Sequence, residues 1–123
     1  MAAGLPWVRI DSDLAQNPRI AEMIAEHGQR GVAAAFVFVC SIGHCAAHNT
    51  DGEIKKAVLP FIHGTPALAR LLVEAELWSQ EEKGWSVTGY ADHQPTMAAR
   101  EADAAARSEA ARKAANARWG NAS

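Results

Sequence analysis

The sequence predicts a mainly α-helical domain with one small β-hairpin, followed by an alanine-rich C-terminal helix. Three observations carry this prediction: a long apolar segment at Val32–His48, a hairpin pattern around Glu81–Gly84, and an alanine-rich stretch at Met97–Trp119. The chain has 123 residues and is 49% hydrophobic, which is enough for one core. We expect one domain over residues 1–94 and a helical tail over residues 95–123, separated by a proline.

The first third of the chain begins with a short extended run and continues into helices. Trp7–Ile10 has a β-like composition. Asn17 suits a helix cap and Pro18 suits the first helical position, so a helix is expected to start here. Gly28 is expected to end this helix, and Gly31 to delay the start of the next one.

The most apolar segment predicts a buried central helix. Its apolar residues recur at helical spacing, so one stripe is expected to face the core. That stripe consists of Val32, Phe36, Val39, Ile42 and Ala46. A turn follows, and Glu53 and Ile54 then supply two residues of a strand.

The next segment has the pattern of a helix-turn-helix with a wing. Lys55–His63 predicts a short helix whose length is limited by a proline. A Gly-Thr-Pro turn follows, in which Thr65 caps a helix over Ala67–Leu77. Residues 78–80 and 85–88 then form a hairpin with a glycine at the turn. This order of elements predicts a winged helix-turn-helix domain.

Several segments resemble winged-helix domains of phage and prophage proteins, especially replisome-organiser and replication-initiator proteins of actinobacteria and their phages. The segments are residues 7–11 (WVRID), 17–20 (NPRI), 50–54 (TDGEI) and 71–78 (LLVEAELW), and tail segments like 107–113 and 117–120 are frequent in that family. The resemblance implies a module that binds double-stranded DNA and acts in replication initiation or gene regulation.

Polar and cationic residues of the helix-turn-helix are the candidate DNA contacts, because cations bind phosphates and polar side chains bind base edges. Lys55 and Lys56 open the first helix, Thr65 and Arg70 lie at the start of the second, and Lys83 lies at the wing tip. The alternative is that these are ordinary solvated residues. With a net charge of −2, the chain is not a generic basic nucleic-acid-coating protein, so binding must come from local clusters.

The tail is locally basic and rich in alanine. Eleven of the 23 residues in Met97–Trp119 are alanine, so this helix buries little area and needs a partner to be firmly held. The partner is DNA, a second protomer or another phage or host protein; the alternative is a solvated helix. Arg100, Arg107 and Arg118 lie within about 20° of one another around the helix and form one stripe. Trp119 offers an apolar anchor at the far end. The candidate DNA contacts of the tail are Arg107, Arg112, Lys113 and Arg118.

No pattern in the chain predicts a metal, a cofactor or an enzyme. Cys40, His44 and His48 follow i, i+4, i+8 spacing, with Cys45 beside them and His63 elsewhere, but the paired knuckles of a structural zinc site are missing. No phosphate-binding glycine loop, nucleophile elbow or metalloprotease motif occurs. We therefore expect no metal, no cofactor and no catalysis.

The chain also has the features of a cytoplasmic protein. Its longest apolar run, Val32–Cys40, is too short to span a bilayer, and its N-terminus lacks the pattern of a signal peptide. On a helix, Cys40 and Cys45 point about 140° apart, so they do not pair readily. A reducing compartment without membrane attachment is expected.

The competing class is a protein-interaction module, such as a phage factor that binds a host protein without binding DNA. An acidic domain with a weakly basic second helix fits that use. Trp85, Tyr90 and Trp119 are the exposed aromatic candidates for such an interface. DNA affinity falls steeply with salt, whereas an aromatic interface barely responds, so salt dependence separates the two classes.

Overall fold

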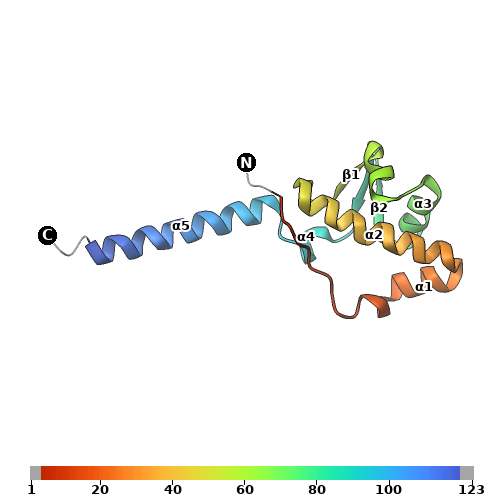
Figure 1. Cartoon of the computed structure of the whole chain (residues 1–123), viewed down its shortest axis with the longest axis horizontal. Coiled ribbons are helices and arrows are strands. Elements are labelled where there is room, and N and C mark those ends of the chain that lie inside the picture. Colours follow the sequence, from red (N-terminus) through yellow and green to blue (C-terminus); the bar gives the residue numbers. More distant parts are fainter. Residues whose placement is uncertain (1–3, 120–123) are drawn as a thin grey trace. The chain divides into compact units, whose positions relative to one another are not determined.

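The computed structural model describes residues 4–119, apart from the side chain of Trp119, and these residues fall into two compact units, 4–94 and 95–119. The first unit holds several helices and a three-stranded antiparallel sheet, and the second holds one long helix (Figure 1). The predicted fold class is confirmed: the chain is mainly helical with a small hairpin and a long C-terminal helix, in a winged-helix-like arrangement.

Apart from the expected N-terminal strand, the elements follow the predicted order, and α4 is an addition. The first unit contains η1 (Leu14–Gln16), α1 (Pro18–His27), α2 (Gln29–His48), β1 (Glu53–Lys55), η2 (Lys56–Ile62), α3 (Pro66–Glu74), β2 (Trp78–Glu81), β3 (Gly84–Val87) and α4 (Tyr90–His93). The second unit contains α5 (Met97–Trp119). Both η elements are 3-10 helices.

Side-chain caps begin α1 and α3, as the sequence predicts. The Asn17 side chain accepts hydrogen bonds from the backbone N–H groups of Arg19 and Ile20, at 3.0 and 3.4 Å. The Thr65 hydroxyl accepts one from the N–H of Leu68 at 3.2 Å. A proline follows each cap at the first helical position, where it loses no hydrogen bond. These local interactions fix where both helices start.

Gly31 permits a close crossing of α1 and α2. A Cβ at this position would lie 2.6 Å from the carbonyl oxygen of Met23 and 2.7 Å from the Cα of Ile24. The prediction that Gly31 delays the second helix is wrong, because α2 already begins at Gln29. Gly28, with a φ of +60°, makes the turn alone and leaves Gly31 free to serve the helix crossing.

The predicted core stripe of α2 is only partly right. Ile42 and Ala46 are buried and Val39 is half-buried, but Val32 and Phe36 are 48% and 56% exposed. The other buried positions are Gly31, Ala34, Val37, Phe38, Ser41 and Cys45. Because α2 is apolar around most of its circumference, its pattern left the phase open, and packing against α1 and α3 decides it.

The α2 helix as a whole is longer and more apolar than its longest uninterrupted apolar run suggests. It has 20 residues, and an 18-residue stretch of it has a mean hydropathy of 1.6, so by length and composition it qualifies as a membrane span. The core helix of a globular fold meets the same criterion, and 44% of this segment is buried within the protein.

The helix-turn-helix region departs from the prediction in the start and type of its first helix and in the end of its second. Lys55 was expected to open the first helix but ends β1, and the helix begins at Lys56. Pro60 lies inside the first helix, which is the 3-10 element η2 and not an α-helix, because proline removes a backbone donor. The second helix, α3, ends at Glu74 and not at Leu77. Glu76 adopts a φ of +61°, and the N–H of Leu77 donates to the carbonyl of Leu72 at 3.0 Å, which closes the helix.

The sheet has the order β1-β3-β2, with the predicted third strand beside the hairpin. Ile54 pairs with Trp85, and Trp78 pairs with Val87. Trp78 and Trp85 are 1% and 8% exposed, with ring centroids 5.5 Å apart. The expectation that Trp85 and Tyr90 are exposed anchors is therefore wrong for both, since Tyr90 is only 6% exposed. The third expected anchor, Trp119, has a side chain outside the described part of the chain.

The expected N-terminal strand is also absent from the described residues. The run Trp7–Ile10 is extended but joins no sheet. The amide of Gln94 takes the place of a neighbouring strand: it accepts from the N–H of Arg9 at 2.9 Å and donates to the Arg9 carbonyl at 2.5 Å. Gln94 is 4% exposed, so this pair of bonds anchors the N-terminal arm, residues 4–13, to the end of α4.

Replacing Ser41 tests the polar interaction inside the core. Trp78 Nε1–H donates to Ser41 Oγ at 3.2 Å, and both residues are fully buried. Ser41→Ala leaves the indole N–H without a partner, so we expect the free energy of unfolding to fall by about 1–3 kcal/mol in urea denaturation. The exposed Ser12→Ala is the control and should change it by less than ~0.5 kcal/mol. Equal values for the two variants would contradict this assignment.

Candidate nucleic-acid interface

Two adjacent lysines and a third that is distant in sequence meet at one corner of the sheet, the lysine corner, formed by Lys55, Lys56 and Lys83. The N–H of Lys56 donates to the carbonyl of Lys83 at 3.2 Å, and Lys55 pairs with Gly84 across β1 and β3. All three side chains are exposed. None of them forms an ion pair with another described residue. Three unneutralised cations are thus available to an anionic ligand.

The close approach of the hairpin to β1 depends on Gly84. A Cβ at this position would lie 2.0 Å from the carbonyl oxygen of Ile54. Glycine therefore lets the tip of the hairpin close against the end of β1. The two residues between β2 and β3 are Glu82 and Lys83, so this register places Lys83 beside the first residue of η2.

The exposed face of α3 carries one cation. Arg70 is exposed, and Thr65 at the cap is exposed as well. Glu74 lies one turn after Arg70 and is also exposed. The helix that follows the turn therefore offers a guanidinium near its start and a carboxylate near its end, with the arginine one turn from the positively polarised helix N-terminus.

Carboxylates surround the lysine corner. Glu53 precedes it on β1, and Glu81 and Glu82 lie at the hairpin tip; all three are exposed. Glu81 accepts a hydrogen bond from the Ser86 hydroxyl at 3.0 Å, and Glu82 has no ion pair among the described residues. The surface is therefore mixed in charge, and a polyanion gains less here than at a purely basic patch.

In the second unit, two of the candidate tail cations form ion pairs and two do not. Arg107 forms an i, i+4 ion pair with Asp103 at 3.4 Å, and Arg112 pairs with Glu109. Lys113 and Arg118 form no ion pair with described residues.

The helix that carries these cations, α5, begins at a capped end, and its side chains at residues 101–118 are all exposed. The Thr96 hydroxyl accepts from the N–H of Ala99 at 3.1 Å, which caps its N-terminus. None of the described α5 side chains is buried. The predicted helix is confirmed, and the four candidate cations from Arg107 to Arg118 are exposed.

The cysteines and histidines do not form a metal site in the described part of the chain. His44 and His48 stack with ring centroids 4.4 Å apart, and His63 lies instead against Phe36 at 6.0 Å. Cys40 and Cys45 are free thiols, as expected. Burial raises the pKa of both thiols, which holds them protonated at neutral pH and disfavours the thiolate needed for nucleophilic attack or metal binding.

The sequence located the lysines but not their proximity. Lys55 and Lys83 are far apart in the chain, and only the pairing of β1 with β3 joins them. The sequence signal for the position of Lys83 was Gly84, which follows a two-residue turn, because such a tight turn places Lys83 at a hairpin tip. The arrangement of the carboxylates around the corner follows from the same register.

The element order helix, helix, strand, helix, helix and hairpin, with the sheet order β1-β3-β2, is consistent with a winged-helix-like arrangement. Comparisons with family models, curated proteins and solved structures found no match to this chain.

A change at His44 tests the electrostatics of the histidine pair. Burial, and secondarily the neighbouring His48, lowers the pKa of His44 below the ordinary value of 6.5. The folded state therefore binds a proton less readily than the unfolded state, and stability falls as pH drops below about 6.5. We expect His44→Gln to reduce this loss, measured by urea denaturation at about pH 7.5 and about pH 5.5.

The exposed His93→Gln serves as the control for this change, since His93 lies on α4, away from the pair. It should keep the acid sensitivity of the unaltered protein. Identical pH dependence for His44→Gln and the unaltered protein would overturn the explanation.

Proposed function

We propose that this protein binds double-stranded DNA through its winged-helix unit, with a role in replication initiation or gene regulation of the phage or prophage type. The observation that carries the proposal is the lysine corner, placed at the start of the helix-turn-helix and at the tip of the hairpin. In winged and simple helix-turn-helix proteins the second helix enters the major groove while neighbouring elements contact the backbone.

The roles of the individual residues follow from this docking mode. Lys55, Lys56 and Lys83 would bind phosphates, which position a protein on the duplex without reading its sequence. Arg70 and Thr65 lie at the start of α3, the part of a recognition helix that reaches base edges. The guanidinium of Arg70 suits a guanine, where it donates two hydrogen bonds.

The carboxylates at the same corner bear on specificity. Non-specific affinity comes from phosphate binding, and Glu53, Glu81 and Glu82 oppose it by repelling phosphates. Affinity for random DNA should therefore be low, so that base contacts from α3 decide where the protein binds. This expectation is consistent with the net charge of −2.

A second candidate function is binding of a partner protein. The observation in its favour is exposed apolar surface: Phe61 and Phe36 are 82% and 56% exposed, and the ring of Phe36 lies against that of His63. Aromatic side chains in such positions are common anchors of protein interfaces. In this case the lysines and glutamates around the hairpin would form a solvated surface that does not bind DNA.

The triple variant Lys55→Ala, Lys56→Ala, Lys83→Ala tests the DNA proposal. We expect weaker binding, with the slope of log affinity against log salt reduced by about 0.9 for each phosphate that the variant no longer neutralises. Fluorescence anisotropy with a labelled duplex over a salt series measures both quantities. Arg70→Ala should weaken binding and lower discrimination between sequences by about 1–3 kcal/mol for the base pair that Arg70 binds.

Two further variants make this test sharper. Glu82→Gln removes a carboxylate from the hairpin tip and should raise affinity by no more than about fivefold, the effect of ~1 kcal/mol. Arg30→Ala removes an exposed cation from α2, outside the interface, and should leave affinity unchanged. Unchanged affinity and slope in the lysine and Arg70 variants would favour the protein-binding candidate instead.

The unpaired tail cations are tested by Lys113→Gln with Arg118→Gln, which keeps good helix formers in α5. If these residues bind phosphates, affinity should fall equally for all duplex sequences and the salt slope should drop by about 0.9 for each phosphate released. If α5 serves assembly, the mass from light scattering should change while the monomer still binds DNA. No change in either measurement would leave α5 a solvated helix.

A further inference from the structure

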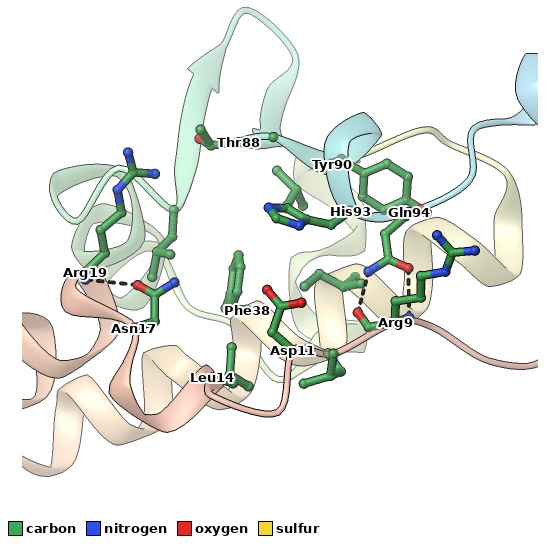
Figure 2. Close-up of a pocket in the computed structure, with 15 residues that line it drawn as sticks. Arg9, Asp11, Leu14, Asn17, Arg19, Phe38, Thr88, Tyr90, His93 and Gln94 are labelled. Carbon is green, nitrogen blue, oxygen red and sulfur yellow. Dashed lines mark hydrogen bonds between the residues drawn. The ribbon is translucent and has the colours of Figure 1, made fainter.

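The first unit contains a cavity of about 110 Å³ that the proposed DNA interface does not use. It lies between the N-terminal arm, α2 and the segment that runs from β3 into α4 (Figure 2). The arm forms one wall because the paired hydrogen bonds between Gln94 and Arg9 hold it in place. The cavity is therefore built by the fold and does not depend on the lysine corner.

The cavity combines an apolar floor with a polar rim. Its floor is made of the buried side chains of Phe38, Ile42, Leu77, Val87 and Tyr90. Asp11 and His93 contribute the rim and are both exposed. In Figure 2 the imidazole of His93 lies above the carboxylate of Asp11, and Phe38 lies beside that carboxylate. A small ligand can thus place an apolar body inside and a polar head between these two groups.

The charges around the cavity select the sign of that head group. Asp11 forms no ion pair and its carboxylate no hydrogen bond with any described residue. The guanidinium of Arg19 is already engaged by Glu76, at 3.2 Å to its carbonyl and 3.9 Å to its carboxylate. The guanidinium of Arg9 points away from Asp11 in Figure 2, past Gln94. The unsatisfied charge that faces the opening is therefore negative.

We propose that this cavity binds a small amine with an apolar body. The ammonium group would donate to the Asp11 carboxylate and to an imidazole nitrogen of His93, which accepts when neutral. The apolar body would lie against Phe38 and Ile42. A closed cavity of about 150 Å³ in another protein holds benzene, so at about 110 Å³ this pocket, which is open to solvent, encloses part of a single ring or a small branched aliphatic group. This inference is independent of the proposed DNA binding.

Three probes with one ring and different head groups test the proposal on the full-length protein: benzylamine, benzyl alcohol and benzoate. Each is titrated in the millimolar range while backbone amide NMR signals are followed. Benzylamine should shift the amides of Asp11, Thr88 and His93 and should bind about tenfold more tightly than benzyl alcohol, because it adds a charge-assisted hydrogen bond. Benzoate should bind more weakly than either.

Asp11→Asn is the decisive variant, and Asp13→Asn is its matched control, since Asp13 is exposed and does not line the cavity. We expect Asp11→Asn to remove the roughly tenfold advantage of the amine and Asp13→Asn to keep it. Binding of benzoate as tightly as benzylamine would overturn the proposal. So would shifts confined to residues outside the cavity, the absence of any shift, or equal losses of affinity in both variants.

Discussion

The hydrogen bond between Trp78 and α2 is the constraint on which the rest of the first unit depends. Trp78 begins β2, is 1% exposed, and donates from its indole nitrogen to Ser41 on the central helix. The Ser41 hydroxyl in turn donates to the Phe38 carbonyl at 2.6 Å, so both side-chain donors in this buried pair are satisfied. Since β2 pairs with β3 and β3 with β1, the interaction that seats Trp78 also orders the hairpin tip and the lysine corner.

The features that the sequence predicted correctly depend on interactions between near neighbours. The caps at Asn17 and Thr65 act within three residues, and the hairpin depends on a two-residue turn before Gly84. The alanine content of α5 is likewise a local property. Such signals are independent of the rest of the fold, and so they can be read from the chain alone.

The features that the sequence could not provide depend on interactions between distant segments. The phase of α2 is one example: Phe36 is exposed because the helix rotates to bring Gly31 against α1. Gln94 is another, since nothing local indicates that its amide replaces a strand for the N-terminal arm. The candidate site follows the same division, because the sequence supplied its lysines and the pairing of β1 with β3 brought them together.

The absence of buried side chains among the described residues of α5 has a thermodynamic consequence. A helix in a protein gains most of its stability from tertiary packing, which the exposed side chains of residues 101–118 do not provide. On heating, α5 should therefore unwind gradually and apart from the cooperative melting of the first unit. Far-ultraviolet circular dichroism would sum both processes, so the two-state assumption does not hold for the whole chain and one midpoint cannot describe it.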